Sequence, residues 1–157
     1  MTPQSAETGN EPLSKSRLRL WLKLLKASNL IEDQIRRRLR EQYQSTLPRF
    51  DVMSALARSP EGLKMSQISE MLRVSNGNVT GIVDRLTDEG LALRVAVPGD
   101  RRASLVRLTP KGQAAFAEHA GAHESWIDDM LDGLNADDVD GMIRRLDYLN
   151  ETLEDKE

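Results

Sequence analysis

Apolar side chains recur at helical spacing along most of the chain, and the breaks between them divide it into predicted elements. Residues 14–44 carry apolar side chains every three or four positions, which predicts one long helix with Ser14 or Ser16 as its N-cap. The Ser-Thr-Leu-Pro sequence at 45–48 ends this helix and begins a short one, because proline suits the first turn of a helix. The Ser-Pro-Glu-Gly sequence at 59–62 is typical of a turn.

Two more short helical patterns follow, joined by a tight turn. Ser66 is expected to cap the first, over residues 67–72. Its predicted buried side consists of Ile68, Met71 and Leu72. Ser75 is expected to cap the second helix, which extends to about Glu89. Helix, turn and helix in this order predict a helix-turn-helix unit.

The second of these helices has one apolar and one polar side. The apolar side consists of Val79, Ile82, Val83 and Leu86. The residues away from it are Asn76, Asn78, Thr80, Gly81 and Arg85. Short polar side chains suit close approach to base edges, since Asn pairs bidentately with adenine. Asn and Ser also simply cap helices, so both interpretations stay open. Gly90 stands where a helix C-terminus favours a left-handed residue.

Two β-type runs, residues 91–97 and 104–108, enclose a charged tip at residues 98–102. The tip carries Arg101 and Arg102, and a hairpin tip with two arginines suits a narrow minor groove. Asp100 is expected to brace an arginine by a charge-assisted bond. A solvated hairpin turn is the alternative interpretation. The expected fold is mainly α with a small β-hairpin wing.

The C-terminal part reads as two further helices. The Thr-Pro pair at 109–110 caps a helix that extends to about Leu131, and Asn135 caps the last one. Apolar stripes at residues 18–25 and 139–153 lie far from the central unit. Pairing with a second chain buries such stripes more readily than one monomer does, which predicts a homodimer.

Composition and charge narrow the function classes. The absence of cysteine from the 157 residues excludes disulfides and thiolate metal sites, and no apolar run approaches the roughly 18 residues of a membrane span. Residues 1–63 hold 11 basic and 7 acidic residues, residues 64–112 hold 8 and 5, and residues 113–157 hold 3 and 13. The central unit is therefore basic within an acidic chain, as a nucleic-acid interface requires. The polar residues 1–13 are expected to form a disordered tail on a cytoplasmic protein.

Two motifs together resemble the MarR family of winged helix-turn-helix transcriptional regulators. The first is the Val-Ser start at 74–75 with the Val-Thr, Val-Asp-Arg-Leu and Glu-Gly-Leu groups between residues 79 and 91. The second is the Asp-Arg-Arg wing at 100–102 followed by Leu-Thr-Pro-Lys-Gly at 108–112. The resemblance implies one MarR-type domain over 14–157, a homodimer and a double-stranded DNA operator. Residues 14–46 and 113–157 would supply the dimerisation helices, and residues 47–112 the winged helix-turn-helix.

The resemblance also assigns residues to the DNA interface. They are Ser66, Ser75, Asn76, Asn78, Thr80, Arg85, Asp100, Arg101 and Arg102. Ser66 and Arg85 would meet phosphates or support the motif, and Arg102 would be the wing arginine braced by Asp100. Gly81 departs from the family, in which a larger polar or basic residue is common at this point.

Family members commonly answer to small molecules, often aromatic and anionic. The Ser-Asn-Gly-Asn-Val-Thr-Gly run at 75–81 is similar to members that control aromatic-acid or hydroxycinnamate catabolism, some through CoA thioesters. The expected function is therefore a repressor released by an aromatic acid or its acyl-CoA ester. The ligand candidates are Arg36, Arg38 and Arg40 for CoA phosphates and Trp21, Tyr43, Phe50 and Met53 for the pocket. Each of these also has a plainer interpretation, as a solvated arginine or a core residue.

Three alternatives remain beside this one. Glu118, His119 and His123 include a His pair at i, i+4 spacing, which suits zinc but does not complete a ligand set. A winged helix also serves as a protein-interaction module in principle. Enzyme chemistry has little support, since no cysteine, phosphate-binding glycine loop or Ser-His-Asp context is present. No cofactor or resident metal is predicted.

Overall fold

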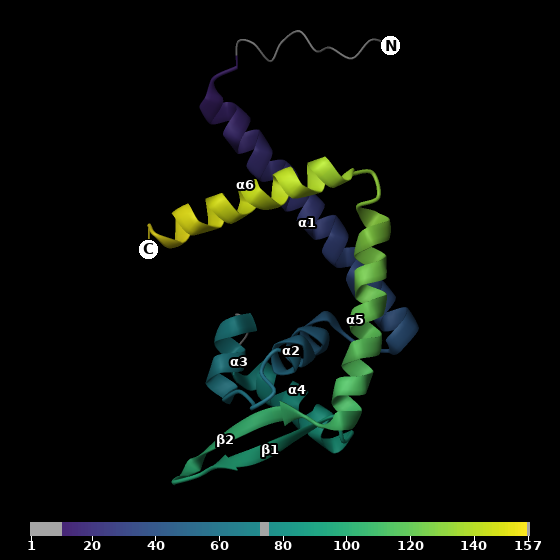
Figure 1. The fold of residues 1–157 in the computed structure, drawn as a ribbon, viewed down its shortest axis with the longest axis vertical. Helices are drawn as coiled ribbons and strands as arrows, with labels where there is room; N and C mark the ends of the chain where they lie inside the picture. The colour runs from purple at the N-terminus through teal and green to yellow at the C-terminus, as the bar shows by residue number, and fades with distance from the viewer. Residues whose placement is uncertain (1–10, 73–75, 157) are drawn as a thin grey trace. The chain divides into compact units, whose positions relative to one another are not determined.

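The computed structural model describes residues 11–72 and 76–156, and the chain forms two compact units, Met1–Ala120 and Gly121–Glu157. The first unit contains α1 (Leu13–Tyr43), α2 (Leu47–Ala57), α3 (Met65–Leu72), α4 (Asn76–Asp88), β1 (Ala92–Val97) and β2 (Asp100–Leu108), as Figure 1 shows. Helix α5 (Pro110–Met130) runs across the boundary, and α6 (Ala136–Glu154) belongs to the second unit. The predicted fold class, mainly α with a two-stranded antiparallel wing, is confirmed.

Helix α1 is the long helix that the sequence predicts, with 31 residues. Its N-cap is Pro12, which makes no side-chain capping bond, so the expectation that Ser14 or Ser16 caps it is wrong. The Ser16 hydroxyl instead donates a hydrogen bond of 3.1 Å to a carboxylate oxygen of Glu11. No helix among the described residues is long and apolar enough to cross a bilayer.

The core of the first unit lies between α2, α3, α4 and the hairpin. Its buried members are Val52, Met53, Leu56, Ile68, Val79, Val83, Leu86, Ala92, Val106 and Leu108. Thr46 caps α2 by accepting the Arg49 N–H at 3.3 Å, and proline stands in the first turn as predicted. Leu63 pairs with Val106 through two backbone hydrogen bonds of 2.9 and 2.8 Å, which ties the segment before α3 to the wing.

Helix α3 differs from its prediction at two points. It begins at Met65, so Ser66 lies inside the first turn and is not the N-cap. The Gln67 side chain closes this end by accepting the Lys64 N–H at 2.9 Å. Met71 is 49% exposed, because the core reaches the Ile68 side of this short helix and only partly covers Leu72.

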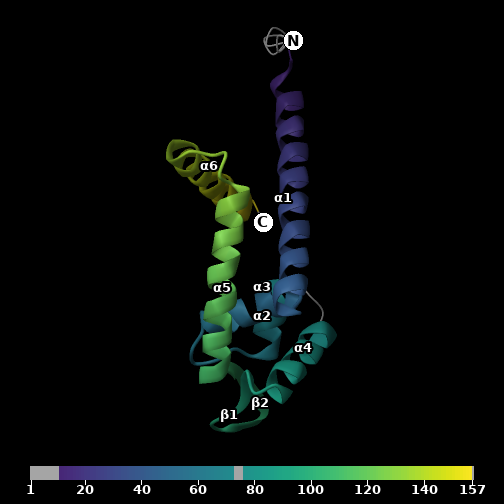
Figure 2. The same cartoon turned by 90° about the vertical axis from the view of Figure 1, so that its right-hand side faces the viewer.

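The end of α4 is fastened to the start of α5 by a set of bonds that we call the α4–α5 joint, residues 89–91 and 109–112. Gly90 adopts the left-handed conformation predicted for it, with φ of 76°. The Lys111 ammonium donates to the Glu89 carbonyl at 3.0 Å, and the Thr109 hydroxyl donates to the Gly90 carbonyl at 2.7 Å. Figure 2 shows α4 and the hairpin meeting at the first turn of α5.

Two features of α5 close this joint. The Thr109 hydroxyl oxygen accepts the Gly112 N–H at 3.0 Å, which confirms Thr109 as the cap of α5. A Cβ atom on Gly112 would lie 1.9 Å from the Leu91 carbonyl oxygen, so only glycine lets the two backbones approach this closely. In the second unit, Asn135 caps α6 through a capping box with Asp138, as predicted for Asn135.

Replacing Gly112 with alanine is expected to lower the free energy of unfolding by about 2 kcal/mol or more, because the methyl group forces backbone apart in a packed joint. Gly121→Ala in the same helix is the matched control, since a Cβ there meets nothing within 4 Å. This control should stabilise the protein by up to about 1 kcal/mol, the helix preference for alanine over glycine. Urea unfolding followed by circular dichroism measures both. Equal stabilities of Gly112→Ala and the wild type would show that the joint is not tightly packed.

Candidate nucleic-acid interface

Helix α4 has one fully buried face and one polar exposed face. Val79, Val83 and Leu86 have no exposed surface, which fixes the rotation of the helix about its axis. The exposed residues of the opposite side are Asn78, Thr80, Gly81, Asp84 and Arg85. Ser75 and the side chain of Asn76 lie outside the described residues, so their predicted roles stay predictions. The core thus presents a row of short polar groups to the outside.

Gly81 lies in the middle of this exposed face. A Cβ atom built on Gly81 meets nothing within 4 Å, so the chain itself does not require glycine there. Glycine costs about 1 kcal/mol in a helix interior relative to alanine. Glycine therefore destabilises α4 slightly here, but the absence of a side chain lets another molecule approach the helix backbone closely.

The wing is a hairpin with an irregular end. Ala96 pairs with Ser104, but the next pair is Val97 with Asp100, so the register shifts at the tip. The expectation that residues 100–102 form the tip is therefore wrong. They begin β2, because Gly99, with φ of 86°, makes the turn in the left-handed conformation that glycine adopts without strain.

Asp100 positions the strand that carries the wing arginines. Its carboxylate accepts the backbone N–H of Arg102 at 3.0 Å. The predicted brace on an arginine is thus a bond to the arginine's backbone amide, which fixes the point from which the exposed Arg102 side chain extends. The side chain of Arg101 lies outside the described residues. Geometrically, Arg102 is a cation held on an exposed strand end.

An ion pair that sequence spacing does not predict joins the wing to the exposed face of α4. The Arg94 guanidinium of β1 lies 2.6 Å from a carboxylate oxygen of Asp84 in α4. Both side chains are about half exposed, so the pair contributes little to stability. The pair adds one polar contact to the packing of β1 on α4. No local spacing connects these two residues, since they meet only after the strand folds back on the helix.

A second ion pair reaches the joint from α2. Arg49 pairs with the carboxylate of Glu89, whose carbonyl also accepts from Lys111. The end of α4 is thereby connected to α2 and to α5 through one residue. The predicted contacts Ser66 in α3 and Arg85 in α4 are both exposed. The described candidate DNA residues therefore lie on α3, α4 and β2 of the first unit.

The seven ligand candidates do not form one site. Met53 is 1% exposed and belongs to the core, and the Phe50 ring packs on Phe116 with centroids 5.6 Å apart. Trp21 is 55% exposed and lies about 22 Å along α1 from Arg36, at 1.5 Å per residue. Tyr43 packs against His119, with ring centroids 4.1 Å apart.

Two of the candidate arginines do come together. Arg36 and Arg40, on successive turns of α1, line a cavity of about 390 Å³ with residues 44–48, which form the connection to α2 and its first turn. Arg36 also lies 3.4 Å from Glu32 and 3.6 Å from Asp33. The cavity therefore has a cationic wall and faces the N-terminal end of α2, where backbone N–H groups favour anions.

His119 is one of the zinc candidates predicted from the sequence, and its environment is resolved in detail. Burial lowers the pKa of its imidazole below 6.5, Arg49 lowers it further, and the carboxylate of Glu118 partly opposes both. Over the described part of the chain, no group of three or more His, Asp or Glu side chains is placed to hold a metal ion. The imidazole ring of His119 packs on the Tyr43 ring instead.

Helix α3, helix α4 with its polar exposed face, and the hairpin that follows define a winged helix-turn-helix protein. The family model described as MarR family matches residues 44–103. These residues include α2, α3, α4 and the hairpin tip, with the motif between residues 74 and 91 and the Asp-Arg-Arg sequence at 100–102. This part of the chain is therefore similar to the MarR family of transcriptional regulators, and the matched proteins are regulators rather than enzymes.

Similar proteins of known sequence or structure support this assignment. The transcriptional regulator MhqR of Bacillus subtilis is 25% identical over 128 residues, covering 82% of this chain and 87% of its own. A MarR family regulator from Silicibacter pomeroyi is 29% identical, with 94% and 100% of the two chains covered and a TM-score of 0.71. FabT of Streptococcus pneumoniae, solved in complex with DNA, is 24% identical over 90% and 99% of the chains, with a TM-score of 0.73.

Proposed function

We propose that this protein is a dimeric repressor that binds a pseudo-palindromic DNA operator and is released by a small anionic ligand. The observation that carries the DNA-binding part is the exposed face of α4, polar and open at Gly81, opposite a fully buried face. A helix held this way presents hydrogen-bonding groups to base edges in the major groove. The same fold in FabT was solved with DNA bound.

The wing supplies the second contact in this proposal. Arg102 extends from a strand end that Asp100 fixes, and Arg94 adds a polar contact between the wing and α4. An arginine at the end of a hairpin fits a narrow minor groove, whose negative potential is enhanced. The remaining candidates, Ser66 and Arg85, are exposed beside the helix-turn-helix and are assigned to phosphates.

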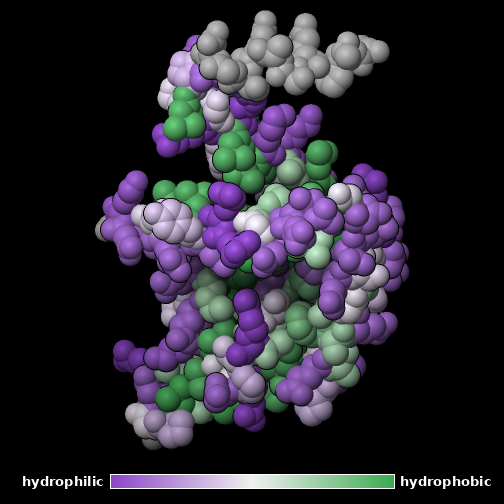
Figure 3. All heavy atoms as spheres, turned by 45° about the horizontal axis from the view of Figure 1, so that its top comes forward, coloured by the Kyte–Doolittle hydropathy of each residue, from purple (hydrophilic) through white to green (hydrophobic). Residues whose placement is uncertain are grey.

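Exposed apolar rows support the homodimer. In α1 and α6 the large hydrophobic side chains that are 37% exposed or more are Leu13, Leu18, Leu20, Trp21, Leu22, Leu25, Leu30, Val139, Met142, Ile143, Leu146, Tyr148, Leu149 and Leu153. Figure 3 shows hydrophobic side chains in green at the surface where α1 begins. Contiguous exposed apolar surface marks an interface. A two-fold dimer would present two α4 helices to two half-sites, and access to chromosomal DNA implies a cytoplasmic location.

Replacing Arg102 with alanine is expected to weaken duplex binding about tenfold and to do so for every sequence tested, because the contact is electrostatic. The slope of log affinity against log salt should fall by about two per dimer, one for each arginine removed. Fluorescence anisotropy with labelled duplex at several salt concentrations measures both quantities. Arg145→Ala, an exposed arginine of α6, is the control with the same charge change. Unchanged affinity and slope in Arg102→Ala would contradict the wing assignment and favour a protein-interaction module.

The ligand in this proposal is an aromatic acid or its CoA thioester, and the cavity beside Arg36 and Arg40 is where its anionic group would bind. Two guanidinium groups on one wall suit phosphate or carboxylate oxygens. The loop 44–46 connects α1 to α2, which packs on α4. A ligand that displaced this loop would therefore alter the position of α4, and half-site spacing tolerates little change.

A panel of aromatic acids and their CoA thioesters is expected to release labelled duplex from the wild type. The double variant Arg36→Gln/Arg40→Gln should need about tenfold more of the active compound, since each lost charge-assisted bond weakens binding. Arg37→Gln, an exposed arginine outside the cavity lining, is the control. If the double variant releases the duplex at the same ligand concentration as the wild type, the ligand binds at another site. If no compound releases the duplex, the ligand class is wrong while DNA binding stands.

A further inference from the structure

An acidic side chain stands on the polar face that α4 presents to DNA in the proposed complex. Asp84 is exposed and lies about 60° around the helix from Gly81, the open position in the middle of that face. A carboxylate at this place repels phosphates, whose attraction supplies the sequence-independent part of DNA affinity. Asp84 therefore opposes the function proposed for the face that carries it.

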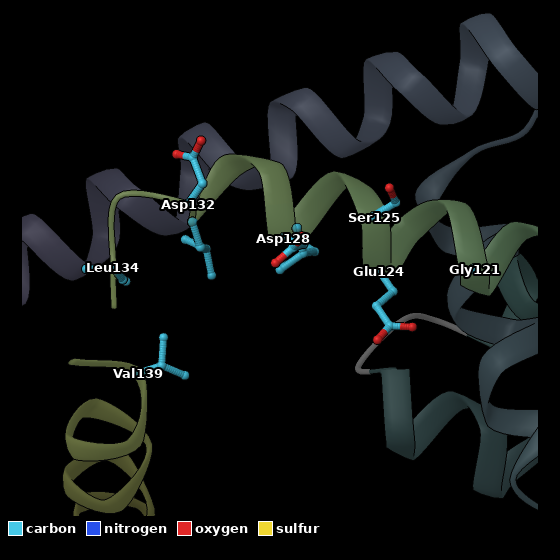
Figure 4. A pocket seen from close by; sticks show the side chains of 9 residues that line it. Gly121, Glu124, Ser125, Asp128, Asp132, Leu134 and Val139 are labelled. Atoms are coloured by element: carbon cyan, nitrogen blue, oxygen red, sulfur yellow. The ribbon is translucent and has the colours of Figure 1, made fainter. Parts of the chain in front are cut away.

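The other acidic residues of the chain lie mainly away from the winged part. Residues 113–157 hold 13 of the 25 Asp and Glu residues, whereas residues 64–112 hold five. Figure 4 shows two of the C-terminal carboxylates, Glu124 and Asp128, on α5 beside a cavity of about 810 Å³ in the second unit. Asp84 departs from this division of charge, so its contacts show what a carboxylate does on α4.

The Asp84 carboxylate is held by an arginine of the wing. The Arg94 guanidinium donates a hydrogen bond of 2.6 Å to it. Arg94 lies on the side of the hairpin that packs on the core, because it alternates along β1 with the buried Ala92 and pairs with the buried Val106 on β2. Its guanidinium therefore lies at the junction of α4 and the wing.

A phosphate backbone passes this junction in the proposed complex. One sugar–phosphate strand separates the major groove of a duplex from the adjacent minor groove. A protein with a helix in the first groove and a wing in the second therefore straddles that strand. The Asp84–Arg94 pair joins these two elements, which places Arg94 beside the phosphates between the grooves.

A carboxylate and a phosphate compete for the same guanidinium. Both are anions that accept charge-assisted hydrogen bonds from arginine. The side chains of Arg94 and Asp84 are 42% and 56% exposed, so water and salt weaken their pair and a phosphate can reach it. While the pair is closed, the charge of Asp84 cancels the charge that Arg94 offers to DNA.

We propose that Asp84 withholds Arg94 from DNA phosphates and thereby lowers the affinity of the protein for duplex DNA of every sequence. The proposal rests on the proposed DNA-binding function and adds a residue that limits it. Phosphate contacts carry no sequence information, so the pair leaves recognition of the operator to the base contacts of α4. Removing the carboxylate frees one cation in each protomer.

Two single variants and their combination test the proposal in full-length protein. Asp84→Asn should bind an operator duplex and a scrambled duplex about tenfold more tightly than the wild type does. The slope of log affinity against log salt should steepen by about two per dimer, because two Arg94 side chains each gain a phosphate. In the Arg94→Gln background, the same substitution should leave the slope unchanged, because the guanidinium is absent. Fluorescence anisotropy at several salt concentrations measures all four proteins.

Asp88→Asn is the matched control, because it removes the same charge from an exposed residue one turn further along α4 and should leave the slope unchanged. The variants should fold as the wild type does, since a half-exposed pair contributes little stability, and circular dichroism checks this.

Unchanged or weaker binding by Asp84→Asn would overturn the proposal, and weaker binding would show that Asp84 itself contacts DNA or aims Arg94 at it. Equal steepening with and without Arg94 would also overturn it, because Asp84 would then act by repulsion alone. A wild type that binds neither duplex at low salt would instead overturn the proposed DNA-binding function.

Discussion

The close backbone contact between the Leu91 carbonyl and Gly112 is the constraint on which the DNA-facing part of the molecule depends. It sets how α4 ends, where β1 begins and where α5 starts, because all three meet within the α4–α5 joint. Thr109 and Lys111 close the joint by donating hydrogen bonds to the carbonyls of Gly90 and Glu89, which form the turn after α4. The Leu-Thr-Pro-Lys-Gly motif at 108–112 therefore has a physical meaning. It orients the candidate recognition helix relative to the helix that leads away from it.

Features set by local chemistry could be predicted from the sequence, and features set by tertiary packing could not. Helix caps such as Thr109 and Asn135, the left-handed Gly90 and the buried face of α4 follow from residue type and spacing alone. The start of α3 was missed by two residues, because the Gln67 side chain closes the helix in place of Ser66. The Asp84–Arg94 pair has a different cause, since only the folded hairpin brings its members together.

The candidate ligand site shows the same limit. The seven ligand candidates, chosen by residue type, lie in the core, on an exposed part of a helix and on one cavity wall. Residue type does not indicate which side chains line the same cavity. The division of charge is more informative. The basic residues lie in the central unit and the N-terminal helix, and the acidic ones lie in the C-terminal segment, so a chain that is acidic as a whole presents a basic surface to DNA.

The central claim is that two copies of the α4 face are held at a fixed separation to read one duplex. Sedimentation velocity of a fluorescent duplex, taken from the DNA upstream of the protein's own gene and titrated with the wild type, tests it most directly. The account predicts one complex of two chains per duplex, formed without a detectable complex of one chain. Saturation at one chain per duplex, or no complex at low salt, would contradict it.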